Sequence, residues 1–144
     1  MTNNSIFYVM LIVGSLFANN TLGLEQNSNG SWNVLYSSQE IIAGFQFNVD
    51  GANINSASGG DAGAAGLFMQ ASGNTLLAFS MTGGFVPPGC GTLASLSLSG
   101  DATGLSGIVV SDAIGGQLDF TYYVENDADL VYDCSDEYPD CAAN

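Results

Sequence analysis

Apolar and polar residues alternate along most of the chain after residue 31, which is the pattern of half-buried β-strands. The clearest case is residues 44–50, where Phe45, Phe47 and Val49 fall on one face and polar residues on the other. The same pattern predicts further strands at residues 32–36, 54–57, 67–70, 77–81, 92–99, 105–110 and 118–124. We expect Phe45, Phe47 and Phe79 to lie in a shared interior.

Glycine-containing turn sequences separate these strands at intervals of about eight to twelve residues. They lie at residues 50–51, 58–60, 72–74, 82–84, 87–91, 99–101 and 114–116. A single helical turn is plausible at 61–66, where the glycines argue against a longer helix. The chain is therefore expected to be all-β, an antiparallel sandwich or barrel of about eight or nine short strands.

The N-terminal region has a different composition. Residues 6–18 form an apolar run of 13, too short to span a bilayer but typical of the apolar part of a secretory signal. Cleavage is expected after Gly23, with Ala18 as the alternative, unless the segment is retained. The expected organisation is a signal or retained apolar segment at 1–23, a linker at 24–31, a sandwich at 32–124 and an acidic cysteine-containing tail at 125–144.

The charge balance excludes several functions. The 144 residues include 14 acidic side chains and no lysine, arginine or histidine, for a formal net charge of -14. Without basic groups the chain cannot neutralise the phosphates of a nucleic acid or clamp a nucleotide, and it has no imidazole base. We therefore expect no nucleic acid partner and no nucleotide partner. The localisation that we expect is secreted, either extracellular or at a cell surface.

Carboxylates are the only acid–base equipment left. Asp61, Asp101 and Asp112 each lie beside glycines in predicted turns, where aspartate commonly accepts hydrogen bonds from its own backbone. We therefore expect no catalytic residue and no enzymatic activity. A carbohydrate-active enzyme with two carboxylates is the remote alternative.

Calcium is the one cofactor that the composition suggests, because hard cations prefer clustered oxygen ligands. Asp127, Asp129 and Asp133 form the densest acidic group, and the three turn aspartates are further candidates as loop ligands. A solvated acidic tail is the alternative.

Cysteine and asparagine residues suggest covalent modification. Cys134 and Cys141 are close enough in sequence to form a local disulfide in an oxidising compartment. Cys90 is then a buried thiol or the partner of one of the other two. Asn29 begins an Asn-Gly-Ser sequon, which is a glycan acceptor if the source is eukaryotic.

Aromatic side chains offer a route to sugar binding by stacking. The candidates are Trp32, Tyr36, Tyr122 and Tyr123. Adjacent residues of a strand point to opposite faces, so at most one of the two neighbouring tyrosines lies outward. Trp32, at the start of a strand, is expected to belong to the core.

Three segments, IIAGFQFNVDGANINSASGG, GNTLLAFSMTGG and PPGCGTLASLSLSG, give the chain a resemblance to the cohesin-like β-sandwich modules of extracellular proteins, over about residues 32–124. The resemblance implies a jelly-roll sandwich related to carbohydrate-binding modules, and a non-catalytic role in gripping a calcium-loaded dockerin or in adhesion. The chain is shorter than a full cohesin, and it lacks the first strand or two unless residues 6–30 supply them.

The function expected from these observations is a secreted binding or adhesion module that recognises a protein, dockerin-like or a second copy, or an extracellular glycan. The alternative is a structural subunit of an extracellular filament. In such a homopolymer the apolar N-terminal segment would complete a neighbour's sheet as a donated strand.

Overall fold

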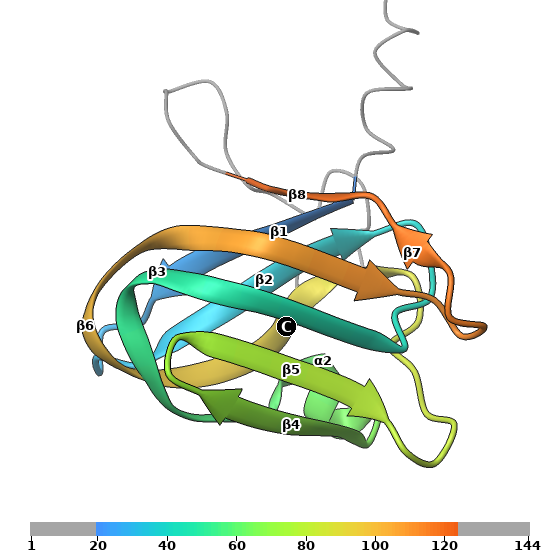
Figure 1. The fold of residues 1–144 in the computed structure, drawn as a ribbon, viewed down its shortest axis with the longest axis horizontal. Helices are drawn as coiled ribbons and strands as arrows, with labels where there is room; N and C mark the ends of the chain where they lie inside the picture. The colour runs from blue at the N-terminus through green and yellow to red at the C-terminus, as the bar shows by residue number, and fades with distance from the viewer. Residues whose placement is uncertain (1–19, 124–144) are drawn as a thin grey trace, which may run out of the picture.

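The computed structural model describes residues 20–123, which fold into a sandwich of β-strands with one short helix (Figure 1). The elements in chain order are β1 (Asn20–Gln26), β2 (Trp32–Ser38), β3 (Gly44–Ser58), α2 (Gly60–Ala64), β4 (Leu67–Ser72), β5 (Thr75–Ser80), β6 (Gly89–Ser111), β7 (Gln117–Leu118) and β8 (Phe120–Tyr122). The expected all-β sandwich is confirmed, and the helix lies where the single helical turn was expected.

The strands form one hydrogen-bonded sheet that folds over into two layers. The order is β4-β5-β3-β6-β2-β1-β8, with β7 added to β6. Pairing is antiparallel except between β1 and β8, which run parallel. In Figure 1 the front layer contains β4, β5, the first half of β3 and the second half of β6, while β1, β2 and the first half of β6 lie behind.

The two layers are continuous because β3 and β6 bend together. The bend lies at Gly51 and Gly100, whose φ angles of 89° and 118° are in the left-handed region that favours glycine. The strands approach so closely there that a Cβ on Gly51 would lie 2.4 Å from the carbonyl oxygen of Asp101. The turns predicted at 50–51 and 99–101 are therefore wrong. Each is a bend within one long strand, of 15 residues in β3 and 23 in β6.

The core lies between the layers and contains the predicted residues of β3. Phe45, Phe47 and Val49 are 3%, 0% and 0% exposed. The expectation for Phe79 is wrong, because its side chain is 37% exposed on the outside of the front layer. Leu76 and Ala78 point inward from β5 instead. Both faces of β5 are apolar, so the alternation in TLLAFS does not decide which face is buried.

Strand β1 occupies the region where a linker was expected. Six of its residues pair with β2, and Leu22 is fully buried. Residues 24–26 therefore belong to the sandwich, with Leu24 packed against the core. The strand that the resemblance left in doubt is supplied by the chain itself.

Asp61 fastens helix α2 to strand β2 of the sandwich. The hydroxyl of the buried Tyr36 in β2 donates a 2.6 Å hydrogen bond to the Asp61 carboxylate. Gly60 lies against the β6 backbone, where a Cβ would come within 2.4 Å of the Leu93 carbonyl oxygen. Within residues 20–123 no helix is long and apolar enough to cross a bilayer.

Candidate functional site: an apolar sheet face

The outer surface of the front layer carries an unusual set of apolar side chains. We call this surface the apolar face. It is made by two neighbouring cross-strand rows on β4, β5, β3 and the second half of β6. The rows contain Phe68, Phe79, Gly44 and Ser111, and Gln70, Leu77, Gln46 and Val109.

The register of the four strands brings these residues together. Phe68 pairs with Phe79, and their rings meet edge to face with centroids 5.5 Å apart. In the second row Gln46 lies between Leu77 and Val109. Residues on one face of paired strands lie within about 5 Å of their neighbours, so each row is contiguous. No residue of either row is charged.

The strand ends extend this apolar surface. Met81 and Phe85 lie in the loop that follows β5, and Ile114 lies in the loop that follows β6. Both loops are at the end of the front layer where β5 and β6 finish (Figure 1). Phe79 is next to the last residue of β5 and pairs with Phe68. Across residues 20–123, the exposed large hydrophobic side chains are Phe68, Leu77, Phe79, Met81, Phe85, Val109 and Ile114. All seven therefore belong to this face or to the loops at its end. Contiguous apolar patches of this kind mark interaction sites.

Beyond the two apolar rows the same face becomes polar. Thr75 donates a 2.7 Å hydrogen bond to the Asn48 side chain, and Ser106 donates one of 2.7 Å to the Asp50 carboxylate. Tyr122 packs over Gly104, the residue that pairs with Asp50. Burial raises the pKa of the Tyr122 phenol above its ordinary value, and the neighbouring Asp50 carboxylate raises that pKa further.

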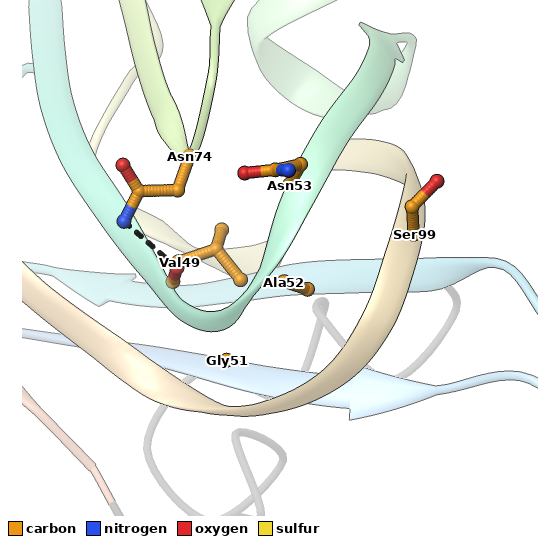
Figure 2. A pocket seen from close by; sticks show the side chains of 6 residues that line it. All are labelled: Val49, Gly51, Ala52, Asn53, Asn74 and Ser99. Carbon is orange, nitrogen blue, oxygen red and sulfur yellow. Dashed lines mark hydrogen bonds between the residues drawn. The ribbon is translucent and has the colours of Figure 1, made fainter.

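A small hollow of about 320 Å³ lies at the bend of β3 (Figure 2). Val49, Gly51, Ala52, Asn53, Asn74 and Ser99 line it. The Asn74 side chain donates a 3.1 Å hydrogen bond to the Val49 carbonyl, so the β4–β5 turn is fastened to the bend. The lining has no ionisable group.

A second hollow, which we call the end hollow, lies at the apolar end of the front layer. Its volume is about 350 Å³, and it is lined by Gln39, Glu40, Ile41, Pro88, Asp112, Ala113 and Ile114. It combines two carboxylates with apolar walls. Asp112 directly follows Ser111, the last residue of the first row, so the end hollow adjoins the apolar face.

The three turn aspartates are not brought together. Asp61 binds Tyr36, Asp101 is exposed at the bend of β6, and Asp112 accepts hydrogen bonds from the backbone N–H groups of Ile114 and Gly116. Turn chemistry is thus confirmed for Asp112. Among the residues that the structure describes, no three acidic or cysteine side chains are grouped closely enough to hold a metal ion.

Several predicted sites lie outside residues 20–123 and stay predictions. These are the calcium ligands Asp127, Asp129 and Asp133 and the disulfide between Cys134 and Cys141. Cys90 is buried, at 2% exposure in β6. Asn29 is exposed in the β1–β2 loop, where its side-chain oxygen accepts a 2.7 Å hydrogen bond from the Ser31 hydroxyl. Its glycosylation is not tested by this geometry.

None of the four aromatic side chains proposed for sugar stacking is in the exposed class, and Tyr123 is half-buried. Tyr36 is 3% exposed. Trp32 and Tyr122 are half-buried and pack against the core, as expected for Trp32. Within residues 20–123 the exposed aromatic rings are instead phenylalanines, of which Phe68 and Phe79 pack edge to face rather than offering a flat platform.

The comparison with solved structures identifies the architecture. A non-cellulosomal cohesin from the hyperthermophilic archaeon Archaeoglobus fulgidus superposes with a TM-score of 0.52 over 73% of this chain and 86% of its own, at 15% identity. The fold is cohesin-like. The cohesin-like module also matches the crystallised CaDoc0917–CaCohA2 complex over 73% of this chain and 95% of that one, at 11% identity and a TM-score of 0.48.

Comparison of the sequence alone relates this cohesin-like chain to no protein family. No family model matches it. No curated protein matches it either. The likeness is therefore one of fold, and the apolar face has to be argued from this chain's own residues.

One sequence signal could have revealed the apolar face. Strand β5 has apolar residues at consecutive positions, Leu76, Leu77, Ala78 and Phe79, and only alternate ones can point into the core. A strand of an outer layer that is apolar on both faces displays one of those faces to a second surface.

Proposed function

We propose that this chain is a secreted, non-catalytic module that binds another protein through the apolar face. The observation that carries the proposal is the collection of every exposed large hydrophobic side chain of residues 20–123 on one layer and the loops at its end. The cores of protein interfaces are depleted in charge and enriched in aromatic residues, and the two apolar rows have this composition. The cohesin-like fold supports a binding role.

A protein partner is favoured over a glycan by the kind of aromatic residue displayed. Sugar platforms need flat exposed rings, whereas Phe68 and Phe79 form an edge-to-face pair beside Leu77. Leucine, valine and phenylalanine side chains bury apolar area against another protein and offer no hydrogen bond to a hydroxyl group.

The filament alternative loses its main support. It depended on a sandwich that lacked its first strand and needed a donated one. Strand β1, at Asn20–Gln26, fills that place in the same molecule and pairs with both β2 and β8.

The position of β1 also bears on export. Cleavage after Gly23 would remove Leu22 from the core and cut β1 in half. Cleavage after Ala18 would leave β1 whole. If the N-terminal segment is a secretory signal, we propose cleavage after Ala18, and mass spectrometry of the secreted protein gives the position directly.

The binding proposal is tested by affinity capture from the proteins of the source organism with three immobilised chains. These are the wild type, the double variant Leu77→Ser/Phe79→Ser, and Leu35→Ser as the control. Leu35 lies on β2 between the inward-facing Val34 and Tyr36 and is therefore on the outside of the other layer. We expect the same captured protein with the wild type and the control, and a loss of at least about tenfold with the double variant.

Capture that is equal for all three chains would rule out the apolar face as the binding surface. Thermal unfolding of the three chains checks that the substitutions leave the sandwich folded, above all at Leu35, which is half-buried.

A further inference from the structure

We propose that the end hollow receives a lysine or arginine side chain of the protein that covers the apolar face. The inference rests on the proposed function, and it adds the chemistry by which the partner is recognised.

The walls of the end hollow match the two parts of such a side chain. Ile41, Pro88 and Ile114 are apolar, and Glu40 and Asp112 are acidic. Ile114 is 92% exposed, the most exposed of the large hydrophobic residues that the structure describes. Long cationic side chains lay their methylene stems on apolar surface and place the charged head against polar groups. The volume of about 350 Å³ lies within the range of binding pockets.

Both carboxylates are on turns held in place by hydrogen bonds. One oxygen of Asp112 accepts from the N–H groups of Ile114, at 3.1 Å, and Gly116, at 2.7 Å. The turn that carries Glu40 is fixed by the buried Ser38, whose hydroxyl bonds to both the N–H and the carbonyl of Glu40. A preorganised acceptor loses less entropy when a partner binds.

The chain itself cannot neutralise these two charges. It contains no lysine, arginine or histidine, so any counter-charge at the end hollow has to come from outside. The hollow adjoins the apolar face, because Asp112 follows Ser111 of the first row and the Ala43 N–H donates a hydrogen bond to the Ser111 carbonyl. A partner seated on the apolar rows would therefore reach the two carboxylates with residues at its rim.

Two other occupants fit the hollow less well. A second copy of this chain would bring a net charge of -14 and no cation. A calcium ion prefers six to eight oxygen ligands, whereas Ile41, Pro88, Ala113 and Ile114 make four of the seven lining residues apolar.

The test uses NMR of the ¹⁵N-labelled chain and a set of matched peptides. The probes are acetylated, amidated pentapeptides Ser-Leu-X-Leu-Ser, in which X is lysine, arginine, norleucine or glutamate. The lysine and arginine peptides are expected to shift the amides of residues 40–41 and 112–116, because the N–H groups of Ile114 and Gly116 report on the Asp112 carboxylate. The norleucine and glutamate peptides are expected to leave those amides unmoved.

Variants separate this site from general charge attraction. Glu40→Gln/Asp112→Asn is expected to weaken binding of the lysine peptide about threefold or more, since each lost ion pair contributes modestly at an exposed site. The control Glu25→Gln/Asp119→Asn removes the same charge from exposed positions elsewhere and is expected to leave binding unchanged. Glu40→Gln alone keeps the Asp112 turn intact and is expected to show part of the loss.

The inference is overturned if the norleucine and lysine peptides shift the amide signals of the end hollow equally. It is also overturned if Glu40→Gln/Asp112→Asn and Glu25→Gln/Asp119→Asn weaken binding of the lysine peptide equally. It is also overturned if calcium chloride shifts these amides at an ionic strength where lysine does not, or if the shifts follow self-association of the chain. Each of these outcomes leaves the capture result with Leu77→Ser/Phe79→Ser standing. Loss of that capture result would instead reject the proposed function.

Discussion

Tyr122 shows how single residues in this chain respond to a surface without positive charge. Its ring covers Gly104 beside the Asp50 carboxylate, which also accepts a hydrogen bond from Ser106. In most proteins a lysine or arginine nearby would offset such a carboxylate. Here the phenol is held neutral by burial and by a neighbouring negative charge, and both raise its pKa.

The raised pKa of Tyr122 predicts a loss of stability in alkali. Because the pKa is higher in the folded chain than the value of 10.0 expected for the unfolded one, the unfolded state loses its proton first as pH rises through about 10. The free energy of unfolding should therefore fall as pH rises through about 10 and toward the higher pKa of the folded chain. Tyr122→Phe should make this fall shallower, as should Asp50→Asn, which lowers the pKa. Denaturant unfolding at several pH values measures the free energy of unfolding. If it fell equally steeply with pH in the wild type and both variants, the fall could not be assigned to Tyr122.

At the residue scale the sequence predicts those features that depend on neighbouring residues in the chain. Asp112 beside two glycines is expected to cap a turn, and it does. Phe79 is expected inside and lies outside, because a strand with leucine and phenylalanine on one face and leucine and alanine on the other carries no local signal for which face is buried. Cross-strand pairing with Gly44 and Phe68 decides it.

At the scale of the element, the alternation places the strands after residue 31, but two of the glycine-containing sequences are wrongly expected to end strands that continue through them. Asp50-Gly51 and Ser99-Gly100-Asp101 have the composition of turns, and in sequence a turn and a bend look the same. They are bends because each glycine lies against the backbone of the other strand, about fifty positions away in the chain. Such a contact is visible only once β3 and β6 are paired.

The bend predicts different outcomes for two glycines that share a backbone conformation. Gly51→Ala and Gly30→Ala both place a side chain at a φ near 90°. The new Cβ meets nothing within 4 Å at Gly30, whereas at Gly51 it meets the Asp101 carbonyl at 2.4 Å. We expect Gly51→Ala to lower the free energy of unfolding by at least about 1 kcal/mol more than Gly30→Ala. Chemical denaturation compares the two variants, and equal losses would show that backbone strain alone sets the cost.

At the scale of the whole molecule, charge is the property that composition predicts most directly. The seven acidic residues among residues 20–123 and the seven that follow them repel one another, and no basic side chain offsets any of them. A net charge far from zero favours solubility but opposes compact states. We therefore expect the apolar face to remain exposed without self-association at low salt.

Because salt screens the repulsion between the carboxylates, it should stabilise the folded chain and at the same time lower its solubility. Raising sodium chloride from about 10 mM to about 300 mM shortens the screening length and should raise the melting temperature by several degrees. Light scattering on the same samples should show association at high salt, which Leu77→Ser/Phe79→Ser should reduce. A melting temperature that does not change with salt would show that repulsion between the carboxylates contributes little to stability.

The pairing of β1 with β8 has a consequence for how the molecule is made. Asn20 lies beside Phe120, and Leu22 beside Tyr122, so the first strand of the sandwich to leave a ribosome finds one of its two neighbours only after about a hundred further residues. Until then the nascent polypeptide has an unfinished edge at its leading end. A chain assembled in this order completes its sandwich only late in synthesis.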